Sequence, residues 1–194
     1  MFILYALLAG LLAGFLLGGS TQRLGALNFR FGWLMLAGLV VQIVLFSAPV
    51  AQRIGSLGPA VYVGSTVAVL VAVARNWRIT GVPIVVAGAA SNLAAIVANG
   101  GYMPADPVAL AAVGHSIDSV YSNSTILANP ALWPLTDILA LPSWLPFANV
   151  FSIGDIAIGF GVAMAIVAAM RGVRNDPAAP APLTELDPSQ AAGR

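Results

Sequence analysis

The sequence predicts an all-α integral membrane protein, a bundle of five transmembrane helices with a long extracytoplasmic loop before the last helix. Three observations predict this class. Of the 194 residues, 59% are hydrophobic and only 8% are charged, whereas a water-soluble domain carries about 25% charged residues. Apolar runs recur along the chain at lengths that suit a bilayer. The arginines alternate between successive connecting segments, as they do in multi-pass membrane proteins.

Five apolar runs of roughly 16–21 residues are long enough, or nearly so, to cross a hydrocarbon core. A backbone in lipid must satisfy its own hydrogen bonds, so each run is expected to be helical. The predicted helices cover about residues 2–17, 31–50, 57–74, 82–98 and 150–170. No basic residue precedes the first run, so we treat it as a retained helix and not as a signal peptide. Frequent Gly and Ala residues predict close packing among the first, third and fourth helices.

Arginine placement predicts the orientation in the bacterial inner (plasma) membrane. Arginines follow the first, third and fifth helices, at Arg23, Arg30, Arg75, Arg78, Arg171 and Arg174. The loop after the second helix has only Arg53, and the long loop 99–149 has no basic residue. By the positive-inside rule the N-terminus and this loop lie outside, and the C-terminus is cytoplasmic. Residues 1–174 are predicted to form a single transmembrane domain, and the Pro/Ala-rich segment 175–194 a disordered cytoplasmic tail.

Composition excludes several kinds of chemistry. The chain has no cysteine and no lysine, which rules out disulfides, thiolate zinc sites and lysine Schiff bases. A net charge of +1 argues against nucleic acid as a partner. His115 and Asp118 have a spacing that suits two metal ligands, but no third ligand is identifiable, so we interpret them as surface residues and expect no metal and no cofactor. The expected partners are the lipid bilayer and a membrane-attached peptide or membrane protein.

Two carboxylates dominate the polar chemistry. Asp137 lies in the long loop, Asp155 lies near the start of the last apolar run, and Pro142 and Pro146 lie between them. Two carboxyls held close together do not both ionise, so one retains a proton while the other activates water, as aspartyl proteolysis requires. The prolines would fold the segment back and bring the two acids together. The alternative is that Asp155 caps the last helix and that Asp137 is a solvated loop residue.

Other polar residues are candidates for binding. Asn92 lies within the fourth apolar run and must find a hydrogen-bond partner there. The run Asn99-Gly100-Gly101-Tyr102-Met103-Pro104 is either a wall of the site that holds a substrate strand or the end of the fourth helix, because glycines after an apolar run are typical of a helix C-terminus. Farther along the loop, residues 108–114 favour a short helix on the membrane surface, with Trp133 and Trp144 at the interface.

The C-terminal half resembles the lipoprotein signal peptidases, which are membrane aspartyl peptidases. The resemblance rests on Leu135-Thr136-Asp137-Ile138, on Phe151-Ser152-Ile153-Gly154-Asp155 and on Gly88-Ala89-Ala90-Ser91-Asn92-Leu93. It implies that Asp137 and Asp155 are catalytic and that Asn92 and Ser152 orient them or the scissile carbonyl. The chain departs from that pattern at Ala94-Ala95, where those enzymes carry Asp-Arg, and its loop is far longer.

The whole chain also resembles a bacterial membrane family of unknown function. That family shares Asn-Gly-Gly-Tyr-Met-Pro, here residues 99–104, a Leu-x-Asp-Ile segment and Phe-Ser-Ile-Gly-Asp. The sequence therefore supports two functional hypotheses: an aspartyl peptidase-like membrane enzyme, or a non-enzymatic scaffold or accessory subunit that docks a partner through the outer loop. A carrier or channel is disfavoured because no charged residue lies in the middle of a predicted helix.

Overall fold

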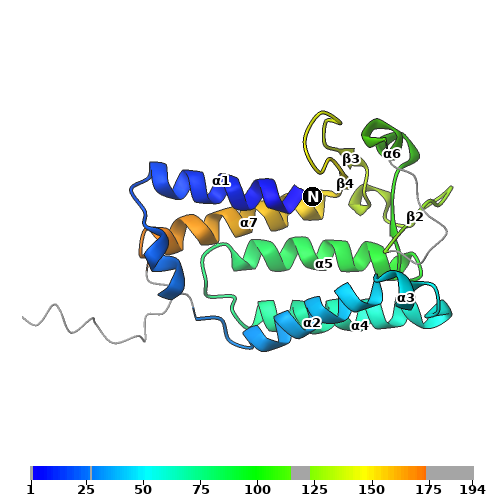
Figure 1. The fold of residues 1–194 in the computed structure, drawn as a ribbon, viewed down its shortest axis with the longest axis horizontal. Coiled ribbons are helices and arrows are strands. Elements are labelled where there is room, and N and C mark those ends of the chain that lie inside the picture. Colours follow the sequence, from blue (N-terminus) through cyan, green and yellow to red (C-terminus); the bar gives the residue numbers. More distant parts are fainter. Residues whose placement is uncertain (1, 27, 115–122, 174–194) are drawn as a thin grey trace, which may run out of the picture.

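A computed structural model describes residues 2–26, 28–114 and 123–173. Long helices lie side by side, and short strands and helical turns gather at one end of them (Figure 1). The long helices are α1 (Phe2–Leu16), α2 (Gly32–Leu45), α4 (Gly58–Ala74), α5 (Val82–Ala98) and α7 (Ile153–Met170). The shorter elements are η1 (Thr21–Ala26), α3 (Ala48–Ala51), η2 (Gly55–Leu57), β1 (Met103–Pro104), α6 (Pro107–Val113), β2 (Ser124–Thr125), η3 (Trp133–Leu135), β3 (Leu139–Ala140) and β4 (Val150–Phe151).

The helices pack in the order α1–α7–α5–α4–α2, with α7 against both α1 and α5. Glycines allow these helices to approach closely. A Cβ added to Gly88 of α5 would lie 2.5 Å from the carbonyl oxygen of Gly154 in α7, and one added to Gly10 of α1 would lie 2.9 Å from the Cα of Ala163. The predicted packing among the first, third and fourth runs therefore holds for α4 with α5, whereas α1 packs mainly on α7 because small residues line both of those helices.

Two helical segments are long and apolar enough to cross a membrane, Gly55–Ala74 and Ile153–Met170. The other long helices are apolar but shorter, with 15 residues in α1, 14 in α2 and 17 in α5. The predicted helix 31–50 is wrong in its last five residues, because α2 ends at Leu45 and a separate short helix, α3, begins at Ala48. Pro49 has no N–H to donate to Leu45, and its ring would clash with that carbonyl in a continuous helix.

Successive long helices alternate in direction, and this alternation separates the charges. At one end, Ser20 after α1 donates its N–H to the carbonyl of Met170 at the end of α7, and Asn76 after α4 binds the main chain of Arg30 before α2. The turns at this end carry Arg23, Arg30, Arg75, Arg78 and Arg171. Asp106, Asp137 and Asp155, all the acids in the described part of the chain, lie at the other end with Arg53. We call these the basic end and the acidic end.

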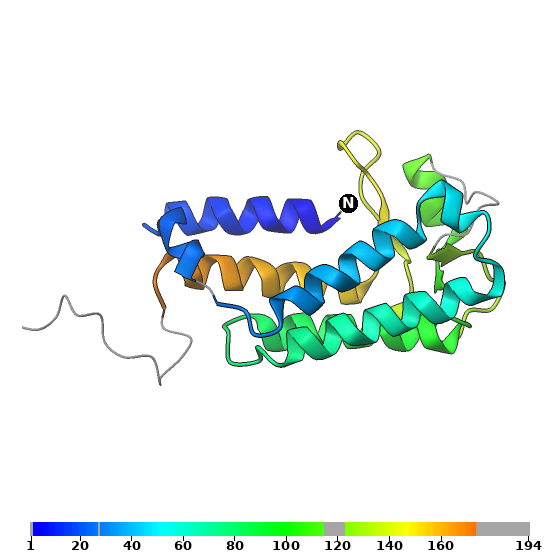
Figure 2. The ribbon, with the colours of Figure 1, turned by 60° about the horizontal axis from the view of Figure 1, so that its bottom comes forward.

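Segment 99–149 at the acidic end is more structured than a simple loop, although its described elements are short. Strand β1 pairs in parallel with β2, and β3 pairs antiparallel with β4. Helix α6 occupies residues 107–113, close to the predicted 108–114. Figure 2 shows these elements beyond the start of α7 and near the ends of α4 and α5 on that side, opposite the turn that follows α1. The last helix starts at Ile153 and not at residue 150, because Val150 and Phe151 belong to β4.

Candidate functional site

A β-hairpin joins the two candidate acids. Leu139 pairs with Phe151 and Ala140 with Val150, and the N–H of Leu141 donates to the carbonyl of Asn149 at 3.1 Å. The prolines of this segment lie in the hairpin loop, where a missing N–H costs no ladder hydrogen bond. The chain therefore doubles back between Asp137, which precedes β3, and Asp155, which follows β4.

The main chain of Asp137 is clamped to the segment that follows α5. Its N–H donates to the carbonyl of Pro104 at 3.0 Å, and its own carbonyl accepts from the N–H of Asp106 at 3.0 Å. On the opposite edge of the same segment, Met103 and Ala105 donate their N–H groups to the carbonyls of Asn123 and Thr125. A short three-stranded arrangement thus fixes Asp137 beside the end of α5.

The side chain of Asp137 is buried and lacks donors. It is 9% exposed, and its Oδ1 atom has no hydrogen-bond partner among the residues that the structure describes. Burial, and then the nearby charge of Asp155, raises the pKa of Asp137 from 3.8 to about 7. Burial without a donor disfavours the charged form of a carboxyl. Asp137 is therefore suited to keep its proton near neutral pH.

Asp155 has the opposite surroundings. It lies in the first turn of α7 and forms a capping box with Ser152: the N–H of Asp155 donates to Ser152 Oγ at 3.0 Å, and the N–H of Ser152 donates to Asp155 Oδ2 at 3.0 Å. Asn92 of α5 donates its Nδ2 to Asp155 Oδ1 at 2.9 Å. Ser152 is fully buried, and its hydroxyl donates to Asn92 Oδ1 at 2.8 Å. These donors, at the positive end of a helix, suit an ionised carboxylate.

A cavity of about 230 Å³ opens beside Asp155 and is lined also by Phe2, Ile3 and Asn149. The first turn of α1 covers this region, since Phe2 stacks on Phe151 with ring centroids 4.6 Å apart. Sequence reasoning missed these three lining residues, because only the packing of α1 against α7 and the hairpin brings them to Asp155. No local pattern in the first run signals that contact.

The remaining predicted binding residues support the chain around the pair. Asn99 donates Nδ2 to the carbonyls of Ala95 and Ala131 and accepts the N–H of Ala131 at 2.8 Å. Gly100 is exposed, whereas Gly101 is buried against Pro59, and both have positive φ. This is the geometry of a helix end, the second of the two predicted roles. Tyr102, half-buried, leads into β1.

The candidate metal ligands His115 and Asp118 lie outside the described residues. Within the described ranges, no group of three or more His, Cys, Asp or Glu residues is placed to hold a metal ion.

Comparisons with known proteins give a family but no activity. No curated protein and no solved structure matches the chain. The resemblance to lipoprotein signal peptidases therefore has no support from these comparisons and stays a hypothesis drawn from short motifs. The model of one family matches residues 26–167, which span α2 to most of α7. The chain thus belongs to a family of unknown function, DUF5317.

Proposed function

We propose that the chain is a multi-pass protein of the inner membrane, in which all five long helices cross the bilayer and the acidic end, with the N-terminus, faces outward. Large apolar side chains on the outside of the helices support this, among them Leu12 at 61% and Ile43 at 63% exposure. Water would not tolerate so much apolar surface, but lipid does. The gathering of arginines at the other end supports a cytoplasmic position for the basic end.

We further propose that Asp137 and Asp155 catalyse the hydrolysis of a peptide bond in a membrane-attached peptide. The observation that carries this proposal is their unequal surroundings: Asp137 is buried with an oxygen that has no partner among the described residues, while Asp155 accepts hydrogen bonds from Asn92 Nδ2 and from the N–H of Ser152. Two interacting carboxyls with such different environments divide the roles of acid and base between them.

In the proposed reaction the carboxylate of Asp155 takes a proton from water, and the water oxygen attacks the carbonyl carbon of the peptide. The carboxyl of Asp137 gives its proton to the carbonyl oxygen, which produces a gem-diol. Asp155 then returns its proton to the amide nitrogen while Asp137 takes one from a diol hydroxyl, and the C–N bond breaks. Asn92 and Ser152 act as positioning residues that hold the carboxylate of Asp155.

A scaffold function is the second candidate. The network of Asn92, Ser152 and Asp155 ties α5 to the capped start of α7, a role that needs no chemistry. At the tip of the hairpin, Trp144 and Phe147 are 79% and 72% exposed. Exposed aromatic residues of this kind suit a protein interface or the membrane interface.

The two candidates are separated by substituting each acid and comparing peptide termini. Membranes from cells that produce wild type, Asp137→Asn or Asp155→Asn are compared by quantitative mass spectrometry for new peptide ends. Asp106→Asn is the matched control, because Asp106 lies at the same end but only caps α6, and Asn caps helices equally well. The peptidase proposal expects ends that both variants lose and the control keeps. If well-folded Asp155→Asn protein yields the same ends as wild type, the peptidase proposal is wrong and the scaffold is favoured.

A further inference from the structure

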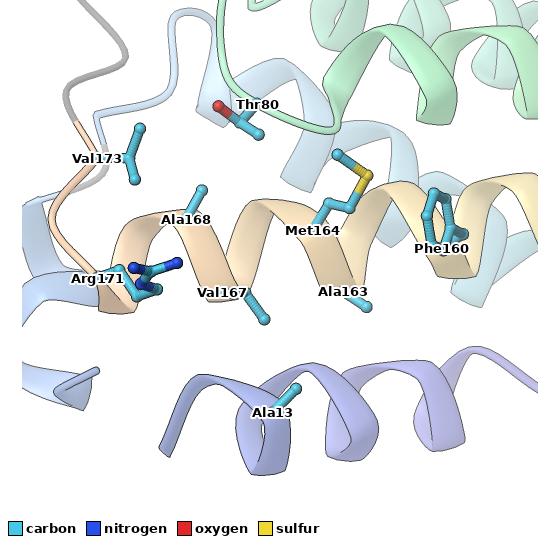
Figure 3. A pocket seen from close by; sticks show the side chains of 9 residues that line it. All are labelled: Ala13, Thr80, Phe160, Ala163, Met164, Val167, Ala168, Arg171 and Val173. Atoms are coloured by element: carbon cyan, nitrogen blue, oxygen red, sulfur yellow. The ribbon is translucent and has the colours of Figure 1, made fainter. Parts of the chain in front are cut away.

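An apolar groove runs along α7 to the basic end, opposite the end that carries the acid pair. It has a volume of about 390 Å³, within the range of sites for small molecules. Figure 3 shows its construction: α7 forms the floor from Phe160 to Arg171, Ala13 of α1 forms one wall, and Thr80 of the α4–α5 turn lies at the other side.

The groove exists because small residues meet there. Ala13 on α1 faces the side of α7 that carries Ala163 and Val167, and none of these side chains is large enough to fill the space between the two helices. The exposed ring of Phe160, at 59%, marks the end of the groove toward the middle of α7. Because α7 is apolar and long enough to span a bilayer, the molecule that fills such a groove in lipid is a hydrocarbon chain.

Charge distinguishes the other end of the groove. The guanidinium of Arg171 lines it, and no hydrogen bond or ion pair joins that group to another residue in the described ranges. Arg23 of η1 does not line the groove but reaches the same end of α7, where its Nη1 donates to the carbonyl of Met170 at 3.5 Å and lies against Gly172. Every acid in the described ranges lies at the acidic end, so within the part of the chain that the structure describes no carboxylate lies beside these cations.

We propose that this groove binds one anionic phospholipid, with an acyl chain along α7 and the phosphate on Arg171 and Arg23. Charge complementarity selects the headgroup, because a guanidinium binds phosphate through paired N–H donors. An uncharged amphiphile would leave Arg171 without a partner. The inference rests on the proposed membrane location and is independent of the chemistry of the acid pair.

Retained lipid provides the test. The full-length protein is reconstituted into nanodiscs with equal amounts of phosphatidylglycerol and phosphatidylcholine, then released and analysed by native mass spectrometry. We expect one phosphatidylglycerol to be retained per chain. Arg171→Gln should reduce the preference for phosphatidylglycerol about fivefold, the effect of one basic residue near an anionic lipid surface. Arg53→Gln, at the acidic end, is the matched control and should keep the wild-type preference.

A second variant tests the groove itself. Val167→Phe places a ring where the acyl chain would lie, so it should abolish retention of both lipids while leaving the melting temperature near that of wild type. The proposal is overturned if wild type retains no lipid, or if Arg53→Gln loses as much preference as Arg171→Gln. It is also wrong if lipid is retained only by a chain shortened to Val173, since the C-terminal segment would then occupy the groove in the full-length protein. It is equally wrong if Val167→Phe converts a dimer into monomers instead of releasing lipid, since a second copy of the chain would then be the occupant.

Washing the membranes at alkaline pH separates failure of the groove proposal from failure of the membrane proposal. A protein that stays in the washed membranes but retains no lipid contradicts the groove proposal alone. A protein that is released by the wash contradicts both.

Discussion

The raised pKa of Asp137 predicts that the stability of the protein falls as pH rises, and that Asp137→Asn removes this fall. The pKa of Asp137 is about 7 in the fold against an ordinary 3.8, because of burial first and the charge of Asp155 second. Between these values the folded chain holds a proton that the unfolded chain has released. Its free energy of unfolding therefore decreases with rising pH, until the folded carboxyl ionises as well.

The expected magnitude follows from the size of the shift. Each pKa unit corresponds to about 1.4 kcal/mol, and a window from pH 5 to pH 8 contains about two units of the interval in which only the folded chain is protonated. The wild-type protein should lose ~2–3 kcal/mol of unfolding free energy across this window through Asp137 alone. Asn at this position keeps the shape of the side chain and does not titrate. The difference in unfolding free energy between wild type and Asp137→Asn should therefore change by this amount between pH 5 and pH 8. The variant should be the more stable of the two, relative to pH 5, at pH 8.

Unfolding in mixed detergent and SDS measures this difference, with tryptophan fluorescence as the signal and matched samples at pH 5, 6, 7 and 8. Infrared spectroscopy provides a direct check, since the band of a protonated carboxyl should disappear with a midpoint near pH 7 in wild type and be absent from Asp137→Asn. Asp106→Asn is the control and should follow the wild-type profile. Parallel profiles for wild type and Asp137→Asn would refute the reasoning, because Asp137 would then be ionised in the fold throughout.

The second cause of the shift has its own consequence. Asp155→Asn removes the charge that helps to raise the pKa of Asp137, so the infrared midpoint should move to lower pH but stay above 3.8, because burial remains. An unchanged midpoint would mean that the charge of Asp155 does not act on Asp137, and the proposed sharing of roles between the two acids would lose its basis.

Three further substitutions test the supports of the site, two by thermal unfolding in detergent and one by proteolysis. Ser152→Ala removes the buried cap of α7 and should cost about 1–2 kcal/mol; an unchanged melting temperature would contradict the capping role. Gly154→Ala adds a Cβ only 2.8 Å from the carbonyl of Gly88 and should cost about 1–3 kcal/mol, whereas Gly64→Ala, with open space around it, should cost nothing. Asn99→Ala breaks the hydrogen bonds to Ala131 and should speed proteolysis of the outer segment. Asn99→Gln should restore the resistance to proteolysis only in part.

The sequence predicted those elements whose signals are local. Helix α5 was predicted at residues 82–98 and occupies Val82–Ala98, because Gly81 and Pro83 mark its start and Asn99-Gly100-Gly101 its end. The fold of the segment between the acids also followed from local chemistry, since Pro142 and Pro146 interrupt an otherwise apolar stretch. The sequence also signals the alternative role of Asp155 as a helix cap, because Ser-x-x-Asp before an apolar run is typical of a helix N-terminus.

Features that depend on contacts between distant residues could not be predicted in this way. The clamp of Asp137 onto Pro104 and Asp106 pairs segments about thirty residues apart, and no period in the sequence fixes that register. This pairing buries Asp137, and its burial decides whether it keeps a proton. The sequence alone therefore could not choose between a catalytic acid and a solvated loop residue at this position. The cavity beside Asp155 and the groove beside Arg171 both require α1 to pack on α7, which hydrophobic runs alone do not specify.

The hydrogen bond between Asn92 and Asp155 depends on the absence of a side chain at Gly154. A Cβ there would overlap Asn92 Oδ1, so any larger residue would push α5 away and lengthen the 2.9 Å contact. About two turns further along α7, Gly161 allows α5 to stay close, since a Cβ there would lie 2.6 Å from the carbonyl of Gly81. Helix packing in lipid gains little from hydrophobicity and relies on such backbone approach. The geometry of the acid pair is therefore set by the glycine face of α7 as much as by the polar groups that touch Asp155.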